Sequence, residues 1–183
     1  MLSPDNCVLT IVDIQGKLAQ LMTDKDRLFG NLQLVTQGVK LFNIPVLWLE
    51  QLPEKLGPTI PELAACLPDQ KPISKSCFSA CDSGDYMFAL GNTRRQQVLL
   101  AGIEAHICVY QTCKHLIARN YEVHLLTDCI SSRHPDNRKL AIDRMVGLGA
   151  IPTSVEMALY EMQRYAEGDR FCQMVKLVKD SGL

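Results

Sequence analysis

The sequence predicts an α/β fold: a three-layer αβα sandwich around a mostly parallel, Rossmann-like central sheet of about six strands. Apolar runs of strand length alternate with helical patterns along the whole chain. The strand runs are almost continuously apolar, which is typical of parallel sheets covered by helices on both faces. We find no internal repeat, low-complexity segment or linker, so residues 1–183 are expected to form a single domain.

The predicted strands are short runs rich in β-branched and other apolar residues. The first, Val8–Val12, ends at Asp13, and the second, Val46–Leu49, ends at Glu50 and Gln51. The other four are expected at Ile73–Lys75, Val98–Ala101, Val123–Leu126 and Ile151–Thr153. Ligands of open α/β sheets bind at the carboxyl ends of strands, near a reversal in strand order. Polar residues at these ends are therefore the candidates for a site.

The predicted helices carry recognisable start and stop residues. Arg27–Phe42 repeats apolar residues at spacings of three and four, which indicates an amphipathic helix. Pro135–Leu148 begins with proline and is followed by glycine, and Thr153 to Glu156 resembles a capping box opening Val155–Arg164. Further helices are expected at Pro61–Cys66, at Asp85–Leu90 with Gly91 closing it, at His106–Ala118 and at Asp169–Lys179.

Composition limits the classes of function. The formal net charge is −1 and Lys and Arg form no run, so binding to nucleic acid or to an anionic membrane has no electrostatic support. No apolar run approaches the length of a membrane span. The first residues lack the pattern of a secretory signal, and most of the eight cysteines lie in apolar element interiors. We therefore expect reduced cysteines and a cytoplasmic protein.

The most informative segment is Leu99–Cys113, a predicted strand, glycine turn and helix that places Cys108 near the helix start. Unpaired backbone N–H groups and the helix dipole favour a thiolate there, so Cys108 is a candidate nucleophile. Asp13 could accept its proton, Lys75 could supply a positive charge, and backbone N–H groups around Glu104 could bind an oxyanion. Each residue also has a structural interpretation, as a turn residue, a solvated lysine or a core cysteine.

Three motifs strengthen the chemical interpretation. They are Asp13-Ile-Gln15 after a β-rich run, the segment 75–80 that begins Lys75-Ser-Cys, and the segment 102–109 that contains Cys108. Their order resembles that of the three motifs of the isochorismatase-like cysteine hydrolases, and the resemblance extends from Val8 to about Met162. Within that superfamily, the segments 50–59 and 121–133 are most similar to the isochorismatase domain-containing proteins.

The resemblance implies a catalytic triad of Asp13, Lys75 and Cys108. It also implies a cis peptide bond between Ile103 and Glu104 that aims the amides of Glu104 and Cys108 into the site as an oxyanion hole. The implied activity is hydrolysis of a small amide or related carbonyl compound at a C–N bond, through a thioester on Cys108. Relatives usually form dimers or higher oligomers, so a homo-oligomer is expected.

No metal or other cofactor is expected. Nicotinamidases of this superfamily carry a metal site built from Asp and His residues after the second strand, whereas residues 49–57 here contain no histidine. All four histidines lie in the second half of the chain. Cys77 and Cys81 could suggest a metal or redox pair, but no second pair at a useful spacing accompanies them.

Several residues are candidates for contacting the substrate, namely Gln15, Gln51, Phe78 and His106. Gln15 would orient Asp13 or contact substrate, or else make a turn hydrogen bond. Phe78 would line the pocket or pack in the core. His106 fits a role at the rim of the site better than that of a second base, because positions i and i+2 of a helix face different sides. Arg133 would face an anionic substrate group or pair with Asp128.

Two other functions compete with a hydrolase. The chain could be a binding protein that keeps the fold and pocket without catalysis, or a redox-responsive protein that uses Cys108 as a sensor thiol. The set of Asp13, Lys75 and Cys108 favours the hydrolase, because a scaffold needs none of these residues.

Overall fold

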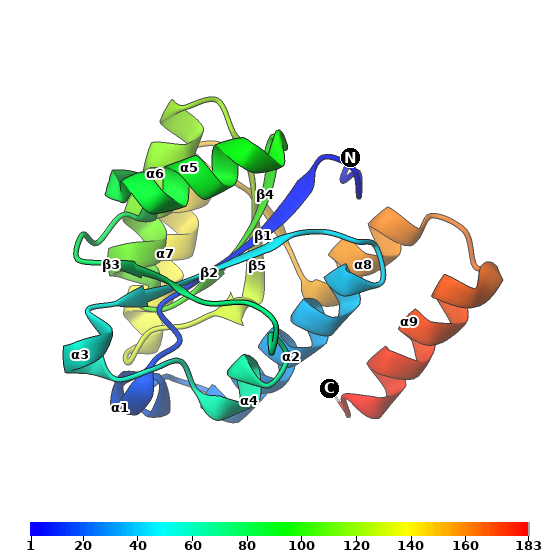
Figure 1. Cartoon of the computed structure of the whole chain (residues 1–183), viewed down its shortest axis with the longest axis horizontal. Helices are drawn as coiled ribbons and strands as arrows, with labels where there is room; N and C mark the ends of the chain where they lie inside the picture. Colours follow the sequence, from blue (N-terminus) through cyan, green and yellow to red (C-terminus); the bar gives the residue numbers. More distant parts are fainter. Residues whose placement is uncertain (183) are drawn as a thin grey trace.

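The computed structural model describes residues 1–182 and contains one six-stranded sheet in which every neighbouring pair is parallel. The strand order is β3-β2-β1-β4-β5-β6, and Figure 1 labels β1 to β5. The strands are β1 Cys7–Val12, β2 Val46–Gln51, β3 Ile73–Lys75, β4 Gln97–Gly102, β5 Glu122–Ile130 and β6 Ile151–Thr153. The predicted α/β sandwich is confirmed, with all six strands at the predicted places.

Helices connect these strands and cover both faces of the sheet (Figure 1). They are α1 Gly16–Gln20, α2 Lys25–Lys40, α3 Pro53–Leu56, α4 Pro61–Ala64, α5 Gly84–Thr93, α6 Tyr110–Ala118, α7 Pro135–Gly147, α8 Val155–Gln163 and α9 Gly168–Asp180. A 3₁₀ turn, η1 Ala80–Asp82, precedes α5, and a π-helical turn, η2 Ala105–Val109, precedes α6. The predicted helices are all present, while the short α1, α3 and η1 were not predicted.

Alternate residues of each inner strand enter two separate hydrophobic cores. Leu9 and Ile11 of β1 pack with the helices α2, α8 and α9. Val8 and Val12 of the same strand pack with α5, α6 and α7 on the other face. This division follows from the period of two along a strand, which sends successive side chains to opposite faces.

Two details differ from the sequence prediction. Helix α5 continues through Gly91 to Thr93 and ends where Arg94 adopts a left-handed conformation with φ of 55°. Ser154, not Thr153, caps α8: its hydroxyl oxygen accepts a hydrogen bond from the Met157 N–H, while Thr153 is the last residue of β6. The capping position lies one residue later than predicted because Thr153 belongs to β6, which leaves Ser154 as the residue before the helix.

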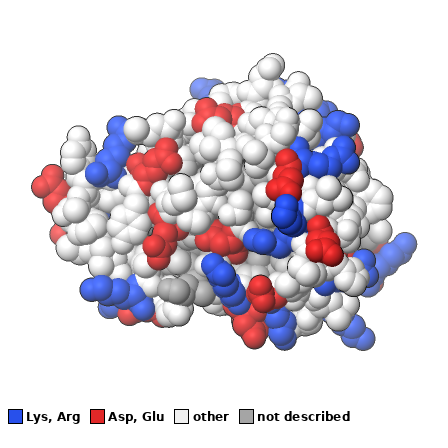
Figure 2. Space-filling model, turned by 180° about the vertical axis from the view of Figure 1, so that it is seen from behind, with Lys and Arg blue, Asp and Glu red and all other residues white. Residues whose placement is uncertain are grey.

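All eight cysteines are free, and none of the helices within residues 1–182 has the length and apolar character needed to cross a membrane. Basic and acidic side chains are interspersed on the face shown in Figure 2.

Candidate active site

The candidate site lies where the strand order reverses. From β1 the chain builds the sheet toward β2 and β3, and from β4 it builds toward β5 and β6, so β1 and β4 are neighbours at the switch point. Asp13 follows the end of β1, Glu104 follows the end of β4, and Lys75 is the last residue of β3. The polar residues predicted from strand ends therefore meet at the edge where open α/β sheets bind ligands.

Asp13 and Lys75 form a buried ion pair. The Lys75 Nζ donates to the Asp13 Oδ2 over 2.7 Å, and the exposed fraction is 0% for the Lys75 side chain and 3% for the Asp13 side chain. The same ammonium donates to the Gln51 Oε1 over 2.6 Å and approaches the backbone carbonyls of Cys77 and Phe78. A buried ammonium is tolerated when its donors are all satisfied in this way.

The second carboxylate oxygen of Asp13, Oδ1, takes no part in the hydrogen bond with Lys75. Among residues 1–182 no donor makes a conventional hydrogen bond to the buried Oδ1, but the Cys108 thiol lies close enough to interact with this carboxylate. Burial raises the pKa of Asp13, and the neighbouring Lys75 and Cys108 oppose that rise. The carboxylate thus has one oxygen committed to Lys75 and one oxygen left for a proton.

The surroundings of Cys108 raise the pKa of its thiol, whereas the sequence led us to expect a lowered one. Cys108 lies on η2 and is 7% exposed. Burial first, and then the negative charge of Asp13, raise its pKa to about 12, although Lys75 opposes the shift. The favourable field at a helix N-terminus corresponds to only about half a unit charge. Desolvation and the facing carboxylate outweigh it, because both disfavour a second negative charge at this place.

The turn between β4 and η2 leads directly into the segment that carries Cys108. Gly102 has φ of +138°, and an added Cβ would lie 2.4 Å from the Val12 carbonyl oxygen, so only glycine lets β4 approach β1 this closely. The peptide bond between Ile103 and Glu104 is cis, which is the geometry that the resemblance implies. The Ala105 N–H then donates to the Ser131 carbonyl over 2.8 Å, which fixes the start of η2.

Arg133 pairs with Glu104, not with Asp128. Its Nε donates to the Glu104 Oε1 over 2.7 Å, and its backbone N–H donates to the Oε2 over 3.3 Å. Both oxygens of the Asp128 carboxylate instead accept from the Val155 N–H at the start of α8. The sequence placed Arg133 near the site but gave no indication that the Glu104 side chain turns toward it.

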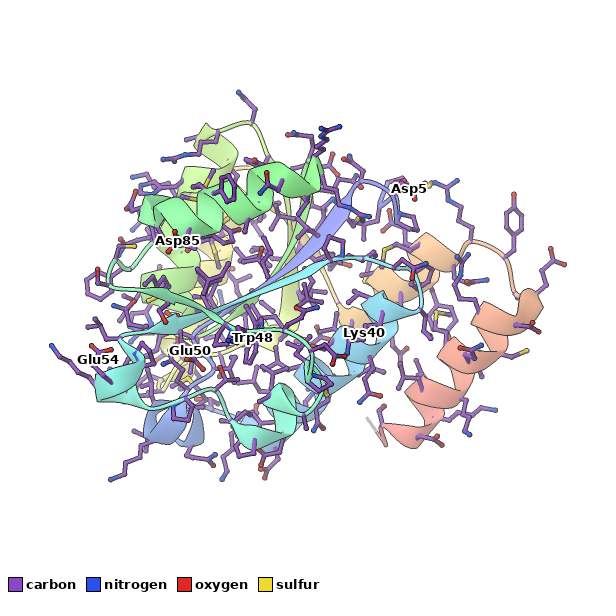
Figure 3. The ribbon with its side chains drawn as sticks, in the orientation of Figure 1. Asp5, Lys40, Trp48, Glu50, Glu54 and Asp85 are labelled. Atoms are coloured by element: carbon purple, nitrogen blue, oxygen red, sulfur yellow. The ribbon has the colours of Figure 1, made fainter. Side chains whose placement is uncertain are left out.

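Gln15 and Gln51, which are predicted to contact substrate, make hydrogen bonds to backbone groups near the site and to Lys75. The fully buried Gln15 side chain bonds the N–H and the carbonyl of Gln51 and the carbonyl of Gly57. The Gln51 amide accepts from Lys75 and donates to the Ser76 carbonyl over 3.0 Å. The Glu50 carboxylate on β2 accepts hydrogen bonds from the N–H and the hydroxyl of Thr59. The Glu50 side chain is labelled in Figure 3.

Phe78 and His106 keep accessible side chains beside this framework. Phe78 is 55% exposed, which excludes the core packing considered from sequence, and its carbonyl faces the Lys75 ammonium. His106 is part-buried, and its Nδ1 lies 3.0 Å from the Ser132 hydroxyl, consistent with a position at the rim. Within the described part of the chain no group of three His, Cys, Asp or Glu residues could hold a metal ion.

Comparison with known proteins identifies the family. Residues 7–157 match the family profile of the isochorismatase domain. The chain belongs to the isochorismatase family. Across 98% of its length it is 33% identical both to the secreted isochorismatase effector Isc1 of Phytophthora sojae (strain P6497) and to the isochorismatase domain-containing protein 2A of Mus musculus, and it covers 87% and 88% of those proteins.

A solved structure supports the same assignment. The protein described as MAR1 ribonuclease from Caenorhabditis elegans has a TM-score of 0.91 and 31% sequence identity, with 97% of this chain and 92% of that chain covered. The family and the fold are those of hydrolases, and the residues of the candidate site lie inside the matched isochorismatase domain.

Proposed function

We propose that this isochorismatase-family protein is a cysteine hydrolase that cleaves a C–N bond in a small amide or a related carbonyl compound. The observation that carries the proposal is the Asp13 carboxylate, which pairs with Lys75 through Oδ2 and has the Cys108 thiol as a neighbour, while its Oδ1 has no hydrogen-bond partner among the described residues. A nucleophile held beside a base that a third group orients is the arrangement that covalent catalysis requires.

The thiolate forms only as the bond to substrate forms. Because the pKa of Cys108 is raised to about 12, the thiol proton moves to Asp13 while the Sγ adds to the carbonyl carbon. The carbonyl π electrons become the oxyanion, which the amides of Glu104 and Cys108 would stabilise as an oxyanion hole. The positive charge of Lys75 offsets the negative charge that develops in this buried space.

The second half of the reaction returns every proton. The C–N bond breaks, the leaving nitrogen takes the proton from Asp13, and a thioester remains on Cys108. Water then attacks the thioester and gives its proton to Asp13, the C–S bond breaks, and the sulfur recovers the proton. This sequence uses a single carboxylate as base and then as acid in each half, and it calls for no metal or cofactor.

Three further proposals complete the function. Exposed apolar side chains on β6 and α8, Ile151, Met157 and Tyr160, favour a homo-oligomer, dimer or higher.

Phe78 and His106, at the accessible rim, are the residues proposed to contact a small-molecule substrate. The free cysteines favour a cytoplasmic location, although one relative is described as a secreted effector.

A nuclease activity is the second candidate, because a similar protein is described as a ribonuclease. Proteins that bind RNA concentrate Lys and Arg along the path of the phosphates. This chain has a net charge of −1, and charges of both signs are mixed on the face shown in Figure 2. The amide hydrolase is therefore the favoured proposal, and RNA is included in its test.

The test compares the wild type with Cys108→Ala on three substrates: 4-nitrophenyl acetate, a panel of small primary and secondary amides, and poly(U) RNA. We expect hydrolysis of the ester and of at least one amide, an acyl group on Cys108 by mass spectrometry after acid quenching, and neither result with Cys108→Ala. Cleavage of RNA that Cys108→Ala retains, with no acyl-enzyme on any substrate, would reject the proposal.

A further inference from the structure

A three-residue strap after β5, Ser131–Arg133, braces the turn that leads from β4 into η2. The Ser131 carbonyl accepts from the Ala105 N–H, and the Ser132 hydroxyl bonds the His106 ring over 3.0 Å. On its other side the strap bonds the loop between α1 and α2, where the Ser131 hydroxyl donates to the Thr23 carbonyl over 2.8 Å and the Thr23 N–H donates to the Ser132 carbonyl over 3.1 Å. The strap is therefore fixed on both sides.

The third strap residue makes a charged contact with the turn. The Glu104 side chain is 5% exposed, and both of its carboxylate oxygens accept hydrogen bonds from Arg133, over 2.7 Å to Nε and 3.3 Å to the backbone N–H. The His106 Nδ1 lies 3.7 Å from the same carboxylate. Hydrogen bonds between charged groups are short and directional, so this contact fixes the orientation of Glu104 more strictly than apolar packing would.

Glu104 is also the residue whose backbone N–H is proposed to bind the oxyanion. The two residues before it have no polar side chain that could serve the same purpose, because Gly102 has no side chain and Ile103 is an apolar core residue. We propose that Glu104 is a positioning residue, whose carboxylate, held by Arg133, fixes the β4–η2 turn so that the Glu104 and Cys108 amides face the developing oxyanion. The inference rests on the hydrolase proposal and adds to it a pair of side chains that do not react.

The expected kinetic effect is on kcat rather than on KM. Oxyanion donors contribute mainly in the transition state, so a loosened turn weakens transition-state binding more than substrate binding. A displacement of about 1 Å can lower the rate about 100-fold. For Glu104→Gln and for Arg133→Met we therefore expect kcat to fall about 10- to 100-fold while KM stays within about twofold.

The two side chains should act as one unit. The double variant Glu104→Gln with Arg133→Met is expected to be no slower than the slower single variant, because the second substitution removes a contact that is already lost. Arg133→Lys keeps a positive charge beside the buried carboxylate, so it should recover part of the lost kcat. It also remains measurable if Arg133→Met leaves the carboxylate unpaired and unfolds the protein.

The experiment measures two reactions of the full chain. The first is hydrolysis of 4-nitrophenyl acetate, which gives kcat and KM. The second is alkylation of Cys108 by iodoacetamide, followed by mass spectrometry, which uses the thiol but forms no oxyanion. Asp143→Asn is the matched control, because it removes a carboxylate from the exposed Lys139–Asp143 pair on α7. We expect the control to match the wild type, and the Glu104 and Arg133 variants to lose kcat. The alkylation rate of Glu104→Gln should be no lower than that of the wild type, because the charge that it removes raises the pKa of Cys108.

Other outcomes reject the inference. A Glu104→Gln protein with wild-type kcat would overturn it and leave the hydrolase proposal intact. Equal losses of kcat and of Cys108 alkylation would also overturn it, because the pair would then support the thiol and not the oxyanion donors. A rise in KM for Arg133→Met that adds to the effect of Glu104→Gln would assign Arg133 to substrate binding. A wild-type protein that forms no acyl-enzyme would overturn the hydrolase proposal and this inference with it.

Discussion

Cys108 and Cys113 lie on consecutive helical segments, η2 and α6, and are both buried in the same core, with exposed fractions of 7% and 0%. Burial raises the pKa of each thiol to about 12. Their neighbours differ: Cys108 faces the Asp13 carboxylate, Lys75 and Glu104, whereas the neighbour that affects Cys113 is another thiol, Cys81. Burial and pKa therefore do not distinguish a candidate nucleophile from a core cysteine. The neighbouring Asp13 carboxylate and Lys75 ammonium are what distinguish Cys108 from Cys113.

Exchange of each cysteine for alanine tests this comparison most directly and has the largest expected effect. Cys108→Ala should lower kcat/KM for 4-nitrophenyl acetate by at least about 1,000-fold, because it removes the nucleophile. Cys113→Ala should keep kcat/KM within about twofold, because no reacting group contacts that thiol. Equal losses in the two variants would show that the core, and not the neighbouring acid, controls the activity.

Removal of Lys75 should give Cys108 surroundings closer to those of Cys113. Lys75→Met leaves the buried Asp13 carboxylate without its partner, so we expect a loss of about 3–5 kcal/mol in the free energy of unfolding and a further rise in the pKa of Asp13. Activity should fall about 100-fold or more with the base. Addition of Asp13→Asn should recover stability in urea denaturation but not activity, and recovery of both would contradict the assignment of Asp13 as base.

The raised pKa of Cys113 also predicts a dependence of stability on pH. The folded thiol keeps its proton up to about pH 12, whereas the unfolded thiol loses it near its ordinary value of 9.0. Stability from this group is therefore complete below about pH 9 and falls by about 1.4 kcal/mol per pH unit above it.

Cys113→Ala removes that dependence. At pH 7 the variant should be less stable by about 1 kcal/mol, because the substitution leaves a small cavity. By pH 10 the difference should shrink to near zero, as measured by urea denaturation at the two pH values. A difference that stays constant would mean that the Cys113 pKa is not raised by folding.

The smallest effect is expected for Phe78, the exposed aromatic residue beside the candidate active site. Phe78→Ala should change the free energy of unfolding by less than about 0.5 kcal/mol. If the ring contacts substrate, KM should rise about threefold through lost apolar contact. Phe88→Ala on α5 is the matched control, because Phe88 is also exposed. The same KM for both variants would remove Phe78 from the site.

Local patterns were sufficient to predict the elements but not every end. All six strands and the longer helices follow from periodicity, because strand and helix repeats are properties of neighbouring residues. Gly91 did not stop α5, because glycine is tolerated inside a helix and the left-handed Arg94 ends it. The four-residue α3 and five-residue α1 have too few residues for a periodic pattern.

The sequence predicted which residues meet at the site more accurately than what they do there. Asp13, Lys75 and Cys108 meet because strand ends in a parallel sheet share one edge. The roles of Gln15 and Gln51 depend on which backbone groups lie within hydrogen-bond distance, and those groups come from loops whose course has no periodic pattern. The predicted pairing of Arg133 with Asp128 was wrong for the same reason.

The sequence by itself determined the α/β architecture, the strand ends and the residue types placed there, because these depend on the local alternation of apolar and polar residues. Only the tertiary structure decided that Asp13 pairs with Lys75, that Glu104 pairs with Arg133, and that the surroundings of Cys108 raise the pKa of its thiol. A pKa and an ion pair depend on burial and on distances between segments far apart in the chain, and these are fixed only when the sheet and its helices pack together.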